Sequence, residues 1–172
     1  MAVTIDASAG GASANSFETL AEFKIYLLSK LHLSTAVSTA TDDTMNRALV
    51  SFARCMEVGM EWEGTPTDYD TQNLQWPRNG LLDALGNILD DTIIPQEIKD
   101  GQSEGAIAII DSDITAANSA DGLSQLKVGP IYMQFTSEGP PRKIIPDAAF
   151  ECFALWGKRK YGASGQVRLV RC

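Results

Sequence analysis

The stretch TDDTMNRALVSFARCMEVGMEW, residues 41–62, carries the clearest helical pattern of the chain. Thr41 or Asp42 is suited to cap the N-terminus, and the acidic Asp42 and Asp43 favour the positive end of the helix dipole. Six apolar residues recur at helical spacing in one stripe: Met45, Ala48, Leu49, Phe52, Met56 and Met60. We therefore expect a long helix with one face in a core, and we interpret its methionines as core residues.

Before this stretch, NSFETLAEFKIYLLSKL predicts a first helix over residues 17–31. Asn15 followed three residues later by Glu18 has the spacing of a capping box. The apolar residues expected to form the buried face are Phe17, Leu20, Ala21, Leu27, Leu28 and Leu31.

After this stretch, two segments that start at a proline predict further helices. One is expected to take Pro95 as its first residue and to be weakened by Gly101 and Gly105. The other begins at Pro146 and places three residues on one face: Ala149, Phe153 and Trp156. The basic Lys158, Arg159 and Lys160 are expected at the C-terminal end of this helix, where the helix dipole favours them.

Between these two segments, KVGPIYMQF (residues 127–135) has the alternation of a strand. Ile131, Met133 and Phe135 occupy one face, and Tyr132 and Gln134 the other. A lone exposed strand is costly, so the apolar face is expected to be buried against a neighbouring molecule.

The fold class predicted from these elements is mainly α. We expect a small helical bundle with an appended β-strand or hairpin and an extended C-terminal arm. Residues 1–14 are expected to be a flexible lead and residues 15–120 a helical core that contains a long loop, residues 63–93. Residues 121–172 supply the strand, the short helix and the basic arm.

The long loop contains a stiff corner, QNLQWPRNG, residues 72–80. Pro77 fixes its own φ and pushes Trp76 toward an extended conformation. Two interpretations remain open for Trp76, Pro77 and Arg78: an aromatic anchor in the chain's own core, or a pre-stiffened contact for another subunit.

Charge divides the chain into two parts. The formal net charge is −8, of which residues 142–172 contribute +5 and the preceding residues −13. An acidic body repels nucleic-acid backbone, whereas a basic end is able to bind phosphate or an acidic protein surface.

The chain shows no motif of a known catalytic or metal site. It lacks HExxH, GxSxG, a Walker A sequence and paired CxxC, and its single histidine, His32, has no catalytic partner pattern. We therefore expect no enzyme activity, no cofactor and no metal. No apolar run reaches the roughly 20 residues that span a bilayer, so no membrane association is expected.

Six segments, taken in order, resemble the head–tail adaptor (connector) proteins of tailed phages. They are NSFETLAEFKIYL, LVSFARCMEVGMEWEG, QNLQWPRNG, IIPQEIKDGQSEGAIAI, LSQLKVGPIYMQF and IIPDAAFECFALWGKRKYGASGQVRLVR, and together they span residues 15–171. This family is often given the label DnaT-like single-stranded-DNA-binding. The apolar patch at residues 81–92 is longer than the usual loop of the family.

The resemblance implies a structural virion protein that is made in the host cytoplasm and resides at the head–tail junction. Such adaptors form a ring, commonly a dodecamer, beneath the portal protein. The ring extends the channel through which genome DNA passes without specific binding, and neck or tail-completion proteins dock on it.

The residues that we expect at interfaces come from the corner, the strand and the basic end. They are Trp76, Pro77, Arg78, Ile131, Met133, Phe135, Trp156, Lys158, Arg159, Lys160, Arg168 and Arg171. The basic arm, from Lys158 to Arg171, is expected to dock on the portal protein or on a neighbouring subunit. The alternatives are a DnaT-like replication protein that binds single-stranded DNA, and another neck or head-completion protein.

Overall fold

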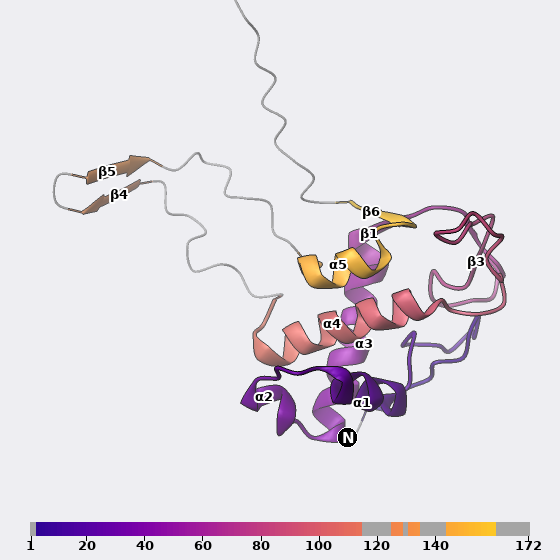
Figure 1. The fold of residues 1–172 in the computed structure, drawn as a ribbon, viewed down its shortest axis with the longest axis horizontal. Coiled ribbons are helices and arrows are strands. Elements are labelled where there is room, and N and C mark those ends of the chain that lie inside the picture. The colour runs from indigo at the N-terminus through magenta and orange to yellow at the C-terminus, as the bar shows by residue number, and fades with distance from the viewer. Residues whose placement is uncertain (1–2, 115–124, 129–130, 135–143, 161–172) are drawn as a thin grey trace, which may run out of the picture.

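The computed structural model describes residues 3–114, 125–128, 131–134 and 144–160, with only the backbone for the second and third of these ranges. In this part of the chain there are five helices: α1 (Leu20–Ser29), α2 (Thr35–Ser38), α3 (Asp42–Gly59), α4 (Gln96–Asp111) and α5 (Asp147–Phe153). Helix α4 packs against both α3 and α5, so it is the centre of the helical body (Figure 1). The mainly α class is confirmed, and the described helices include none with the length and apolar character needed to cross a membrane.

Helix α3 follows the sequence pattern closely. Thr41 is the N-cap, and its side chain accepts a hydrogen bond from the backbone N–H of Thr44 at 3.2 Å. All six residues of the predicted stripe are buried. The amphipathic pattern was therefore sufficient to identify both the helix and its core face.

Helix α1 is shorter than predicted and is capped differently. Thr19 is the N-cap and forms a reciprocal capping box with Glu22, so the predicted pairing of Asn15 with Glu18 is wrong. Phe23 and Leu27 are the buried residues of this helix. The predicted face is corrected at three of its positions, since the side chains of Ala21, Leu28 and Leu31 are exposed.

Helix α4 begins one residue later than predicted, with Pro95 as its N-cap. Its two glycines allow close approach to the neighbouring helices. A Cβ atom at Gly101 would overlap the ring of Phe153 in α5, and one at Gly105 would overlap the ring of Phe52 in α3. These glycines cost helix propensity, but they bring three helices into contact around one core.

Gln102, which is fully buried in α4, joins three separate segments. Its side-chain oxygen accepts hydrogen bonds from the backbone N–H groups of Phe17 at 2.8 Å and Glu18 at 3.1 Å. Its side-chain nitrogen donates to the Ser16 hydroxyl and to the carbonyl of Leu49, both at 2.9 Å. The amide therefore fixes the residues before α1 against α3 and α4.

Glu18 is buried beside this amide and accepts a hydrogen bond from the Ser103 hydroxyl at 2.7 Å. Burial is the main reason that the pKa of Glu18 rises to about 8, and the charges of Glu22 and Asp100 act in the same direction. The carboxyl group is therefore held mainly in its neutral form at pH 7.

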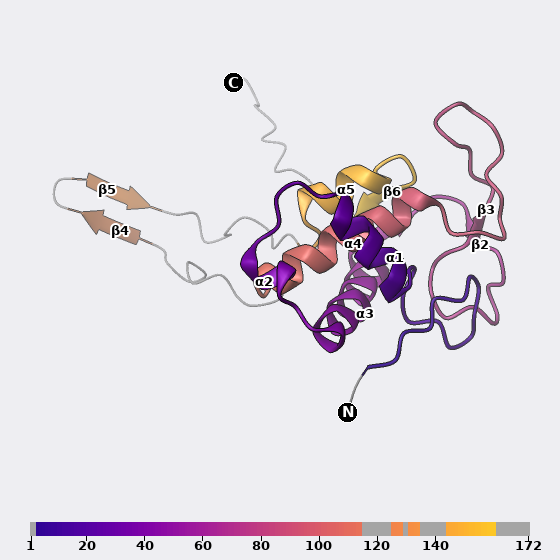
Figure 2. The ribbon, with the colours of Figure 1, turned by 60° about the horizontal axis from the view of Figure 1, so that its bottom comes forward.

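The described strands form three two-stranded antiparallel pairs. They are β1 (Met60–Trp62) with β6 (Gly157–Arg159), β2 (Thr65–Pro66) with β3 (Arg78–Asn79), and β4 (Gln125–Val128) with β5 (Ile131–Gln134). The strand expected within residues 127–135 is confirmed at β5, which pairs with β4 as a hairpin. Both views of the fold draw this hairpin apart from the helical body (Figures 1 and 2).

Strand β6 corrects the prediction for the start of the basic arm. Lys158 and Arg159 were expected at the C-terminal end of a helix, but they lie in a strand opposite Glu61 and Met60. The backbone N–H of Lys160 also bonds to the carbonyl of Gly59 at 2.9 Å. The end of α3 and residues 157–160 are thus tied together, although they are about 100 residues apart in sequence.

Candidate functional site

The described residues hold no arrangement typical of an active site. His32 is exposed. Within the described ranges, His, Cys, Asp and Glu side chains do not gather into groups of three that could hold a metal ion. The candidate sites described below are therefore surfaces for contact with other molecules, together with the buried residues that support those surfaces.

The corner at residues 76–78 lies inside the body. The side chain of Trp76 is 1 % exposed and that of Arg78 is 5 % exposed, and the Trp76–Pro77 peptide bond is cis. Trp76 packs edge-on against Trp62 and Trp156, with ring centroids 5.5 Å and 5.7 Å away. Of the two interpretations from the sequence, the structure shows core packing for these side chains.

Arg78 acts as a clamp for the corner. Its guanidinium donates hydrogen bonds to the carbonyls of Glu63 and Gly64, each at 2.7 Å, and to the backbone and side-chain oxygens of Gln75 at 3.0 and 2.9 Å. Burial lowers the pKa of Arg78, and the nearby carboxylate of Glu57 opposes this shift. An arginine with this many internal partners fixes the path of the loop and is not presented to another molecule.

The other predicted interface residues of the body divide into buried and exposed groups. Trp156 is buried, and its indole N–H donates to the carbonyl of Leu82 at 2.7 Å. Arg159 pairs with Asp147 at 2.7 Å and lies over the ring of Phe150, 4.1 Å from its centroid. Lys158 and Lys160 are exposed.

The remaining predicted interface residues belong to the strand and the C-terminal end. Ile131 lies opposite Val128 in the hairpin, and Met133 lies opposite Leu126. Phe135, Arg168 and Arg171 lie outside the described residues.

Most basic side chains of the described body are already paired. Of the nine Lys and Arg side chains that the structure describes, five form ion pairs with carboxylates. The pairs are Lys24–Asp42, Lys30–Glu104, Arg47–Asp43, Lys99–Glu22 and Arg159–Asp147. A row of cations available for a phosphate backbone is therefore not seen on the described surface.

One group of exposed apolar side chains lies at one end of the body, on the loop before α4. Leu85 is 88 % exposed and Ile88 is 85 % exposed, and Leu82 is also exposed. The turn that carries them is well ordered, because the Asp83 carboxylate accepts hydrogen bonds from the backbone N–H groups of Leu85 and Asn87, both at 2.8 Å. We call residues 82–88 the apolar turn.

A second apolar surface lies on α1. Ile25 and Leu28 are exposed along one side of the helix, and Leu31 follows just beyond its end. This spacing of three residues places the side chains along one face.

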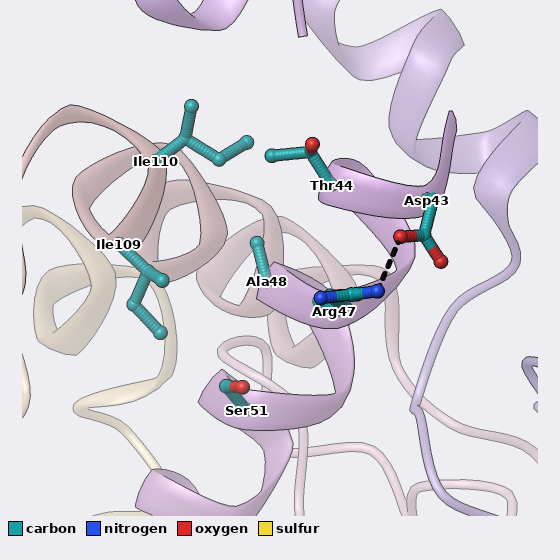
Figure 3. Close-up of a pocket in the computed structure, with 7 residues that line it drawn as sticks. All are labelled: Asp43, Thr44, Arg47, Ala48, Ser51, Ile109 and Ile110. Carbon is teal, nitrogen blue, oxygen red and sulfur yellow. Dashed lines mark ion pairs between the residues drawn. The ribbon is translucent and has the colours of Figure 1, made fainter. Parts of the chain in front are cut away.

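A shallow hollow of about 310 Å³ lies between the first half of α3 and the last turn of α4. Figure 3 shows its lining, with Ala48, Ile109 and Ile110 facing one another across the gap between the two helices. Its rim carries Thr44, Ser51 and the ion pair between Arg47 and Asp43, 2.7 Å apart. We call it the α3–α4 hollow.

The sequence predicts an apolar patch at residues 81–92, but the exposed, ordered turn within it and the α3–α4 hollow were not predicted. The turn has a readable signal, because Asp83, Gly86 and Asn87 are typical turn residues, and Gly86 adopts a φ of 85°. The hollow has no local signal, because it forms only where two distant helices meet.

The model of the family described as "Putative DnaT-like ssDNA binding protein" matches residues 1–172. No curated protein and no solved structure matches the chain.

Proposed function

We propose, from the premise that this chain belongs to the DnaT-like family, that it is a structural assembly protein of the head–tail adaptor type. In this proposal, copies of the chain form a ring beneath a portal protein, and neck or tail-completion proteins dock on the ring. The description of the family favours a second candidate, a protein that binds single-stranded DNA.

The observation that carries the proposal is the contrast between paired cations and uncovered apolar side chains. Proteins that bind single strands without sequence preference combine a positively charged groove with aromatic side chains on which bases stack. In the described body most cations are paired, and the exposed large aromatic residue, Tyr69, lies between Asp68 and Asp70. This surface is poorly suited to a nucleic-acid strand.

The uncovered apolar surfaces are suited to protein partners instead. The apolar turn and the exposed side of α1 each carry large aliphatic side chains in open solvent. Such surfaces mark interaction sites when they are gathered on an ordered element. A ring needs such surfaces, because each subunit contacts one neighbour on either side, and a surface outside the ring contacts is available to the portal protein or to neck proteins.

The acidic body supports the channel role. Residues 1–141 carry a net charge of −13, and like charge denies a DNA backbone any strong binding site. Genome DNA is then able to slide past the ring without adhering to it.

Self-association of the purified full-length chain tests the proposal. We expect light scattering coupled to gel filtration, over a wide concentration series, to show oligomers of one size, and electron micrographs to show rings. A chain that stays monomeric at all concentrations would refute the proposal.

Titration with a labelled oligothymidylate, followed by fluorescence anisotropy, separates the two candidates. We expect the protein to bind the oligothymidylate weakly, whether or not the protein has assembled into a ring. Tight binding whose affinity falls steeply with added salt would favour the single-stranded-DNA-binding function, because counterion release produces that dependence.

The docking of the basic end on the portal protein needs a truncation that spares strand β6. A chain that ends at Lys160 keeps Gly157–Arg159 paired with Met60–Trp62, whereas one that ends at Gly157 removes most of that strand. We expect the first variant to fold and to lose attachment to the portal protein. Unchanged attachment would refute the role of residues 161–172.

A further inference from the structure

The apolar turn is a preformed protrusion. The backbone N–H of Asp83 bonds to the carbonyl of Asn87 at 2.8 Å, and Leu82 pairs with Ile88 in a β-bridge. Because the turn is held by these bonds and by the Asp83 carboxylate, little conformational entropy is lost when it docks. The ordered backbone of the turn therefore presents the side chains of Leu85 and Ile88 to solvent.

The α3–α4 hollow is a matching concave surface. Its apolar floor is formed by Ala48, Ile109 and Ile110, and its volume of about 310 Å³ is large enough to receive aliphatic side chains (Figure 3). No described side chain of the same molecule fills it.

The two features lie at opposite ends of α4. The apolar turn belongs to the loop that leads into Gln96, and the hollow lies against Ile109 and Ile110 in the last turn. A helix of 16 residues is about 24 Å long, so one molecule cannot bring its own turn to its own hollow. Both views of the fold show the loop and the C-terminal end of α4 on opposite sides of the body (Figures 1 and 2).

The turn is acidic, and one arginine without an ion pair in the described structure lies near the hollow. Residues 81–93 contain Asp83, Asp90 and Asp91 and no Lys or Arg. Beside the hollow, Arg47 is paired with Asp43, and Asp111 accepts a hydrogen bond from the Ser34 hydroxyl. Arg54 lies on the same face of α3, seven residues after Arg47, and is exposed without an ion pair in the described structure.

We propose that the apolar turn of one copy docks in the α3–α4 hollow of the next copy, with Leu85 and Ile88 against Ala48, Ile109 and Ile110, and with Asp91 near Arg54. This head-to-tail contact rests on the proposed function and names the surfaces that join the subunits. Repetition of a contact between two different surfaces closes into a ring when the rotation between neighbours permits it.

Two complementary variants test the contact in the full-length chain. Leu85→Asp with Ile88→Asp places charge on the turn, and Ser51→Trp fills the hollow from its rim. Each variant is expected to raise the dissociation constant of self-association at least about tenfold and to appear monomeric in sedimentation velocity. Tyr69→Ser, on an equally open part of the same long loop, and Ser51→Ala are the matched controls and should assemble as the unmodified chain does.

Mixing the two variants provides the decisive measurement. The turn of the Ser51→Trp chain is intact and so is the hollow of the Leu85→Asp, Ile88→Asp chain, so an equimolar mixture should form dimers and nothing larger.

A charge exchange adds a second test. Arg54→Glu and Asp91→Arg should each weaken assembly, and the chain that carries both should recover it.

Three results would overturn the contact while leaving the proposed function intact. The first is assembly of the double aspartate variant at the unmodified level, and the second is an equimolar mixture that stays monomeric. The third is loss of assembly with Leu28→Asp alone, which would place the contact on α1. Loss of assembly on removal of residues 161–172, with the double aspartate variant unaffected, would make the C-terminal segment the occupant. An unmodified chain that never assembles would overturn the proposed function itself, and the contact with it.

Discussion

The corner at residues 76–78 and the apolar turn at residues 82–88 are close in sequence and rich in large apolar side chains, yet the structure treats them in opposite ways. Trp76 is 1 % exposed within an aromatic cluster, whereas Leu85 is 88 % exposed. The Arg78 guanidinium donates hydrogen bonds to carbonyls of its own chain. The Asp83 carboxylate, by contrast, accepts hydrogen bonds that order a turn on the surface.

The ionisable groups of the two regions show the same contrast. Burial raises the pKa of Glu57, which accepts a hydrogen bond from the backbone N–H of Gln75 beneath the corner, to about 6. Hydrogen bonds from Asn87 lower the pKa of Asp83 on the exposed turn. The corner therefore contributes to the stability of one molecule, whereas the turn leaves its apolar side chains in solvent and is, in our proposal, the surface that contacts a second copy.

The largest expected effect is that of Trp76→Ala. Removing a buried tryptophan from a packed cluster leaves a cavity, and we expect the free energy of unfolding to fall by about 4 kcal/mol. Chemical denaturation followed by fluorescence or circular dichroism measures this loss. Tyr69→Ala, at a side chain that is 81 % exposed, should change the value little; equal losses in the two variants would break the contrast.

Arg78→Lys should cost about 2 to 3 kcal/mol of unfolding free energy. A lysine cannot donate to the carbonyls of Glu63, Gly64 and Gln75 together, so buried acceptors are left without partners. The same denaturation experiment applies, with Arg54→Lys on the exposed face of α3 as the control. Equal stability of Arg78→Lys and the unmodified protein would show that the clamp contributes nothing.

Glu57→Gln should change how stability depends on pH. Because folding raises the pKa of Glu57 from 4.5 to about 6, the unfolded chain releases its proton first, and the unmodified protein loses stability as pH rises through this window. We expect the variant to lose about 1 to 2 kcal/mol less between these two values. Glu18 titrates in both proteins, so its contribution cancels in the difference, and parallel pH profiles would contradict the prediction.

The smallest expected effect on stability is that of Leu85→Asp with Ile88→Asp. Both side chains are already in solvent, so the unfolding free energy of the monomer should change by less than about 0.5 kcal/mol. Denaturation at a concentration where the chain is dissociated measures this. A large loss would mean that the turn packs on its own body, and the contrast with the corner would disappear.

The sequence was sufficient where the signal is local. Helix α3 combines a capping threonine, acidic first residues and a single apolar stripe, and each of these acts within a few turns of the helix. Helix α1 is apolar on several sides, with Phe23, Ile25 and Leu27 at alternate positions, so periodicity alone could not decide which face would be buried.

Other features depend on residues that are distant in sequence. Strand β6 forms because Gly157–Arg159 meets Met60–Trp62, and nothing near Lys158 distinguishes that strand from the end of a basic helix. Gly101 and Gly105 weaken a helix in isolation, and their use becomes apparent only when the rings of Phe153 and Phe52 lie against them. The α3–α4 hollow, for the same reason, could not be predicted.

The amide of Gln102 has a consequence for the order in which this chain matures on the ribosome. Residues 16–18 and Leu49 leave the ribosome long before residue 102, yet their polar groups find their native partner on that later side chain. A nascent chain that stops short of α4 therefore holds its first two long helices without the polar contact that aligns them. We conclude that the amino-terminal half becomes native only when translation has passed the middle of the message.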